Sequence, residues 1–228
     1  MKIIGNTLVF CFLLIGSPGI ARILPSSSSR MAPLTQYLMR ADAEISLARS
    51  AAPESISRNA EILVLTKAGF RRAMRGTNGF VCMVARSWSA RFGDPNFWNP
   101  RVRAPICYNA AAALSQVPET MRRTQLALSG GSESQIHEAI KAAFSSGGLP
   151  PAETGSLAYM MSKQTYFSHS EGHWLPHLMF FTPGTDPGSW GAGMPGSPVL
   201  GVKDPEERLT VFLIPLGRWS DGTAAEAH

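Results

Sequence analysis

The spacing of apolar residues predicts helices in two parts of the chain. Between residues 38 and 50 apolar positions recur every three to four residues, the period of an amphipathic helix. Ser132 can cap a clearer helix that runs to Phe144, and Asn109 can cap a shorter one. Residues 120–128 fit either a helix or a strand. The predicted buried stripe of the helix after Ser132 is Ile136, Ile140 and Phe144.

Short runs of strand-forming residues follow the first helix. Residues 61–66, 70–75 and 80–88 are predicted strands, and Asn78-Gly79 is typical of a tight hairpin turn. We therefore expect residues 61–88 to form a three-stranded antiparallel meander.

The C-terminal third is predicted to return to strands, at residues 157–162, 174–182 and 209–216. Residues 94–106 contain three prolines and predict an irregular crossing. Residues 183–205 are rich in glycine and proline without a period, and loops of that length in a compact domain are usually binding loops or lids, or else disordered.

The predicted fold class is α+β, with an antiparallel sheet made of the meander and the C-terminal strands, and with helices on one face. The composition agrees with a globular chain, because 44% of the 228 residues are apolar and 16% are charged. We expect one domain over residues 37–222, a flexible leader over 22–36 and a disordered tail over 223–228.

Residues 1–21 have the pattern of a signal peptide. A basic Lys2 precedes the apolar run at 8–15, and small residues stand before the expected cleavage after Ala21. The run is too short to span a bilayer, and no membrane span is expected after cleavage. The sequence therefore predicts a periplasmic or extracellular protein.

The predicted export determines the expected state of the cysteines. Cleavage removes Cys11 and leaves Cys82 and Cys107, which have only one intramolecular pairing. In an oxidising compartment we expect them to form a disulfide.

Four runs of the sequence carry a resemblance to a known group of proteins. They are RGTNGFVCMV, NFWNPRVRAPICYN, GHWLPHLMFF and DPEERLTVFLIP, and the resemblance that they carry extends over most of the mature chain. They resemble a family of exported bacterial proteins of unknown function. The resemblance implies secretion and a shared domain, and it assigns no activity and no catalytic residue.

A histidine cluster is the first candidate for chemistry. His169, His173 and His177 are four residues apart, and Glu171 lies among them, so the four are a candidate zinc site. Pro176 argues against a continuous helix and favours a turn into a strand. Nearby methionines make copper a second, less favoured metal.

The same region contains the candidate ligand-binding residues. These are His177, Asp186, Trp174 and Trp190, which we expect to converge on a cavity roofed by residues 183–205. The alternative for His177 is an ordinary buried histidine on a sheet.

The chain has a formal net charge of +5, and basic residues are concentrated between residues 67 and 103. Arg71, Arg72 and Arg75, with Trp88, Phe97 and Trp98 interleaved along the segment, form a candidate surface for an anionic envelope component. The alternative is a row of solvated arginines. Export makes nucleic acid an unexpected partner.

Two functions follow from these features. The first is an exported domain that binds a small ligand or metal near the histidine cluster. The alternative is a metal-dependent hydrolase acting on a cell-envelope component, with Glu171 or Asp186 as base.

Overall fold

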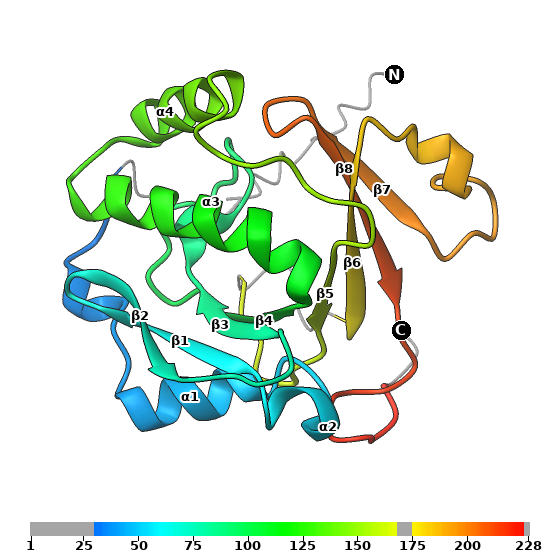
Figure 1. The fold of residues 1–228 in the computed structure, drawn as a ribbon, viewed down its shortest axis with the longest axis horizontal. Coiled ribbons are helices and arrows are strands. Elements are labelled where there is room, and N and C mark those ends of the chain that lie inside the picture. Colours follow the sequence, from blue (N-terminus) through cyan, green and yellow to red (C-terminus); the bar gives the residue numbers. More distant parts are fainter. Residues whose placement is uncertain (1–29, 168–174, 226–228) are drawn as a thin grey trace, which may run out of the picture.

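A computed structural model describes residues 30–167 and 175–225, which form one mixed eight-stranded sheet with helices on both faces (Figure 1). The strands are β1 (Glu61–Thr66), β2 (Gly69–Met74), β3 (Val81–Ala85), β4 (Ala104–Tyr108), β5 (Leu157–Met160), β6 (His177–Pro183), β7 (Leu200–Asp204) and β8 (Leu209–Pro215). The helices are α1 (Ala41–Arg49), α2 (Glu54–Ser57), α3 (Ala110–Leu128) and α4 (Glu133–Ser145), with short 3-10 helices η1 (Leu34–Gln36), η2 (Ser87–Ser89) and η3 (Pro187–Trp190). The α+β class is confirmed.

The sheet has the order β2-β1-β3-β4-β5-β6-β8-β7, and its N-terminal part differs from the expected meander. β1 and β2 form an antiparallel hairpin, but β3 pairs with the other edge of β1, in parallel. Asn78-Gly79 is therefore part of a crossing from β2 past the start of β1, and is not a two-residue hairpin turn. The local sequence favoured a turn there, and long-range pairing decided which strand β3 joins.

The absence of a side chain at Gly76 allows this crossing to pass close to the backbone of β1. A Cβ atom at Gly76 would lie 2.2 Å from the backbone nitrogen of Glu61, at the start of β1. The side chain of Asn78 then fixes the crossing, because its Nδ2 donates to the carbonyl oxygen of Ile56 at 2.8 Å. The backbone N–H of Glu61 donates to the carbonyl oxygen of Phe80 at 2.8 Å and aligns β3 beside β1.

Alternate residues of the strands fill two cores, one on each face of the sheet. Ile62, Val64 and Cys82 pack with α1, whereas Leu63 and Met83 pack in the core that α3 and α4 share. The expectation of helices on one face is therefore wrong. α1 and α3 lie on opposite sides of β1–β4, so both faces there are apolar (Figure 1).

Both predicted helix caps are confirmed. The side chain of Asn109 accepts a hydrogen bond from the backbone N–H of Ala112 at 2.9 Å, and Ser132 forms a capping box with Gln135. α3 is longer than expected, because it continues through Pro118. The predicted stripe of α4 is buried, and it consists of Ile136, Ile140 and Phe144.

The disulfide between Cys82 and Cys107 is present, and these residues are direct cross-strand neighbours on β3 and β4. It closes the loop that contains the irregular crossing between the two strands. The two cysteines are 25 residues apart in the sequence. Loop closure of this size stabilises the folded state by roughly 3 kcal/mol through the entropy of the unfolded chain.

The ends of the described chain are attached to the domain. Met31 and Leu34, in the expected leader, pack against the core, and η1 follows directly. At the other end, the backbone N–H of Ala225 donates to the carbonyl oxygen of Gly217 at 3.0 Å, within the expected tail.

Candidate functional site

A cavity of about 400 Å³ lies between the sheet and α3. Its lining comes from β4 to β8, from one side of α3, and from the crossing between β3 and β4. α3 packs against β2 to β5, and Figure 1 shows that the sheet continues beyond that helix to β6 and β8. Residues of β6 and β8 line the cavity, which therefore extends over this part of the sheet.

The floor of the cavity is apolar because one face of each strand points into it. On β6 the alternate residues Met179 and Phe181 line the cavity, and on β8 Val211 and Leu213 do so. These positions are paired across the strands, Met179 with Leu213 and Phe181 with Val211. β4 continues the same surface with Ala104, Ile106 and Tyr108.

One end of the cavity is built around the buried guanidinium of Arg123. Its Nε donates to Oε1 of Glu119, one helical turn earlier on α3, and its Nη2 donates to Oε1 of Glu207 at 2.8 Å. Its Nη1 donates to the carbonyl oxygens of Ala90 at 2.8 Å and Trp88 at 3.4 Å. All three charged side chains are at least nine-tenths buried, and two carboxyl groups share one guanidinium.

This arrangement changes the protonation of its members. Burial, and then the nearby carboxyl of Glu119, raise the pKa of Glu207 well above its ordinary value, and Arg123 offsets this only in part. Burial alone would lower the pKa of Arg123, but the two carboxylates outweigh it and raise that pKa. Burial, with Glu119 nearby, also raises the pKa of Tyr108 on the floor. Glu207 therefore keeps its proton to a higher pH than an exposed glutamate does, beside the guanidinium of Arg123.

His177 lines the cavity at the β6 end remote from Glu207. Its Nδ1 lies 2.8 Å from the carbonyl oxygen of Leu175, and burial lowers its pKa. The ring is therefore neutral at pH 7. Since strands rise about 3.3 Å per residue, His177 and Phe181 are separated by about 13 Å of apolar floor.

Two of the other predicted ligand-binding residues, Asp186 and Trp190, lie outside the cavity lining. Trp190 stacks on Phe212 with ring centroids 4.2 Å apart, and Phe212 is on the face of β8 opposite to Val211. Asp186 is exposed and accepts a hydrogen bond from Nζ of Lys203 at 3.1 Å. The expectation that residues 183–205 roof the cavity is therefore wrong. η3 packs on the opposite face, and only Val202 and Asp204 of that segment line the cavity.

The metal prediction falls mostly on residues that the structure does not describe. His169, Glu171, His173 and Trp174 lie outside the described residues. Within residues 30–167 and 175–225 no group of three or more histidine, cysteine or acidic residues is arranged to hold a metal ion. Zinc or copper binding stays a prediction.

The basic segment is divided between surface and interior. Arg71, Arg72 and Arg75 are exposed on and after β2, an edge strand, and Arg72 forms an ion pair with Glu61 at 3.2 Å. The aromatic residues that were expected beside them are buried in the core, and these are Trp88, Phe97 and Trp98. Their large apolar surface is better satisfied in the core than on a solvated strand.

Sequence reasoning did not find the polar end of the cavity. Glu119 and Arg123 have the spacing of an ordinary surface ion pair on a helix, and Glu207 stands in a charged turn, DPEER. The available signal was the run of polar residues Gln116, Glu119, Thr120 and Arg123 on one side of α3, a side that the structure buries.

Comparison with known protein families, curated proteins and solved structures found no match to this chain. No helix in the described part of the chain is long and apolar enough to cross a membrane. The site must therefore be interpreted from its own chemistry, and the resemblance to exported bacterial proteins of unknown function stays a prediction.

Proposed function

We propose that this protein is an exported domain that binds a small, largely apolar molecule in the cavity between the sheet and α3. The observation that carries the proposal is the cavity itself, with its apolar floor and a few polar groups at its two ends. Its volume of about 400 Å³ is within the range of small-molecule sites, which combine apolar walls with a few orienting polar groups.

The surroundings of the cavity support a preformed site. The floor belongs to paired strands, and Arg123 makes hydrogen bonds to α3, to the β3–β4 crossing and to the turn after β7. A site on such elements loses little conformational entropy when a ligand binds. The disulfide between Cys82 and Cys107 supports export, because disulfides persist in oxidising compartments.

The alternative is a metal-dependent hydrolase that acts on an envelope component. It depends on His169, Glu171 and His173, which lie outside the described residues. For an envelope-binding role, the exposed arginines of β2 offer a surface separate from the cavity.

Binding of the uncharged fluorophore N-phenylnaphthylamine, followed by its fluorescence, tests the proposal. Met179→Trp fills the cavity from the middle of β6, and we expect it to weaken binding about tenfold or more, a change of ~1.4 kcal/mol. Leu178→Trp is the matched control, because its side chain points to the opposite face of the same strand.

Val211→Phe is a second cavity-filling variant, in case Met179→Trp is poorly folded. Thermal unfolding of every variant separates lost binding from lost structure. Equal affinity of wild type, Met179→Trp, Val211→Phe and Leu178→Trp would contradict the proposal, and so would a wild type that does not bind the fluorophore.

A further inference from the structure

At the polar end of the cavity, most donors of Arg123 are used within the protein, whereas the carboxyl groups of Glu119 and Glu207 can accept further hydrogen bonds. Arg123 directs its Nε and both terminal nitrogens to protein oxygens, those of Glu119, Glu207, Trp88 and Ala90. Four of its five N–H donors therefore have protein acceptors among the described residues. The carboxyl groups of Glu119 and Glu207 have more capacity left for a ligand than Arg123 has, because each carboxylate can accept several hydrogen bonds.

The charge of the lining is also uneven. Its acidic residues are Asp94, Glu119, Asp204 and Glu207, and its arginines are Arg86, Arg91 and Arg123. Arg86 is neutralised from outside the lining by Glu44, at 2.9 Å. Four acidic groups therefore stand against two arginines, in a protein whose formal net charge is +5.

Two buried hydroxyl groups stand at the same end. Ser87 and Ser89 line the cavity and flank Trp88, whose carbonyl oxygen accepts from Arg123. Both Oγ atoms are buried, and that of Ser87 lies by the Tyr37 hydroxyl, whereas that of Ser89 makes no hydrogen bond within the described residues. Since buried polar atoms are nearly always hydrogen-bonded, the Ser89 oxygen is a second indication that a polar group of a ligand belongs here.

From these observations we propose that the cavity takes an amphiphilic amine, with its apolar body over β6 and β8 and its cationic nitrogen between the carboxyl groups of Glu119 and Glu207. The inference rests on the proposed function and adds the chemical class of the ligand. An ammonium group has three N–H donors, which match the two carboxylates and a serine hydroxyl.

Binding of this cation favours loss of a proton from Glu207. Burial and the carboxyl group of Glu119 raise the pKa of Glu207, and an ammonium group beside Glu207 favours its ionised form, so the proton that Glu207 still holds leaves for solvent. The other charged or titratable groups lining the cavity near these carboxyl groups are Arg123 on α3, Tyr108 on β4, Asp204 at the end of β7, and Arg91 and Asp94 in the β3–β4 crossing.

Three compounds with the same apolar chain test the inference: octylammonium, octanol and octanoate, each used below its micelle concentration to displace N-phenylnaphthylamine. We expect octylammonium to bind about tenfold more tightly than octanoate, because a charge-assisted hydrogen bond at a buried site is worth that much. Calorimetry in two buffers of different ionisation enthalpy should show proton release with octylammonium and none with octanol.

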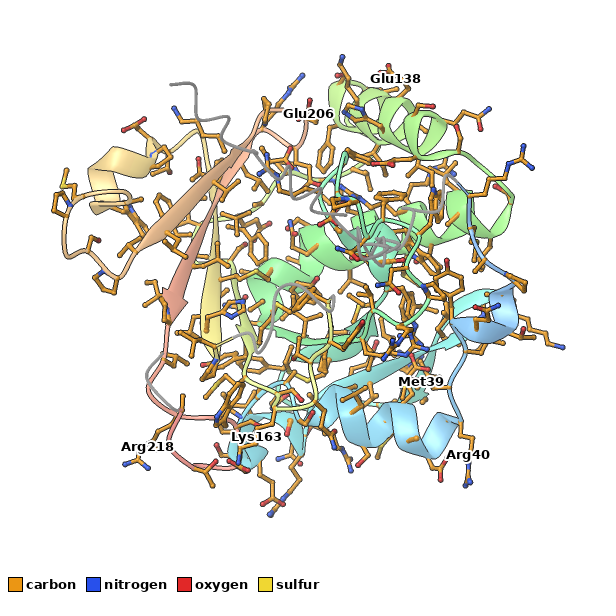
Figure 2. All side chains as sticks on the ribbon, turned by 180° about the vertical axis from the view of Figure 1, so that it is seen from behind. Met39, Arg40, Glu138, Lys163, Glu206 and Arg218 are labelled. Atoms are coloured by element: carbon orange, nitrogen blue, oxygen red, sulfur yellow. A yellow bond between two sulfur atoms is a disulfide. The ribbon has the colours of Figure 1, made fainter. Side chains whose placement is uncertain are left out.

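Glu207→Gln should weaken octylammonium about tenfold and leave octanol unchanged, and retained octanol binding shows that the variant is folded. Glu206→Gln is the matched control. Glu206 is the neighbouring residue, lies beside α4 in Figure 2, and forms an ion pair with His137 outside the cavity lining, at 3.5 Å. Glu119→Gln provides a second variant on the other side of the site.

Octanoate that binds as tightly as octylammonium, or octylammonium binding that Glu207→Gln and Glu119→Gln leave unchanged, would overturn the inference. In either case binding of the uncharged fluorophore would still support the proposed function. If the fluorophore itself does not bind to the wild type, the proposed function and this inference both fail.

Discussion

Arg86 donates from Nη2 to Oε1 of Glu44 at 2.9 Å, and neither side chain has any exposed surface. The same Glu44 oxygen accepts from the backbone N–H of Leu65 at 3.0 Å, and Nε of Arg86 donates to the carbonyl oxygen of Tyr37 at 2.9 Å. This pair joins α1, β1 and the chain before α1 to a wall of the cavity, because Arg86 also lines it.

Glu44→Gln should destabilise the protein by about 3–5 kcal/mol, because it leaves a buried guanidinium without its counterion. Urea unfolding followed by circular dichroism measures the loss. Glu54→Gln removes one partner of an exposed ion pair with Arg58 and should change stability by less than about 1 kcal/mol. Similar effects of the two substitutions would show that the buried pair is not what holds these elements together.

Gly76→Ala should be strongly destabilising, by about 2 kcal/mol or more, because the new Cβ meets the backbone at the start of β1 and the crossing must shift. Gly217→Ala is the control, since a Cβ there meets nothing within 4 Å. The free energies of unfolding of both variants check this. A neutral Gly76→Ala would contradict the close crossing that places β3 beside β1.

The stability of the protein should depend on pH through Glu207. Burial and Glu119 raise its pKa well above 4.5, so the folded protein keeps a proton that the unfolded chain loses. Its stabilising contribution is complete below pH 4.5 and is lost as the pH rises through the folded pKa. Within that window the slope is at most about 1.4 kcal/mol per pH unit.

Glu207→Gln removes this titration, so the stability of the variant relative to wild type should increase as the pH rises through the window. Urea unfolding at a series of pH values measures both proteins, and Glu206→Gln should follow the wild-type curve. Parallel curves for wild type and Glu207→Gln would show that Glu207 is not a buried, protonated group in the folded protein.

Much of the secondary structure was predictable because its causes are local. The cap at Ser132 and the apolar stripe that ends at Phe144 require only neighbouring residues, and α4 forms where they predict. The disulfide was predicted because only Cys82 and Cys107 remain outside the predicted signal peptide. The sheet order was not predictable in the same way. β3 pairs with β1 and not with β2, and this pairing depends on contacts between segments distant in sequence.

The candidate site shows the same division. His177 was identified because it is the last of three histidines spaced four residues apart, and it does line the cavity. Glu119 and Arg123 looked like a solvated helical pair, and nothing near Glu207 indicates that it meets them. Asp186 and Trp190 are close to His177 in sequence, yet strand alternation and the path of η3 place them across the sheet.

By itself the sequence determined α1, α4, the start of α3, most of the strands, the pairing of Cys82 with Cys107, and an α+β domain, because periodicity, capping and cysteine number act over short distances or by elimination. Only the tertiary structure decided the order of the strands, the use of both sheet faces, and the burial of Glu119, Arg123 and Glu207 around one cavity. Whether a charged side chain meets water or a counterion depends on what packs over it, and that is fixed by residues far away along the chain.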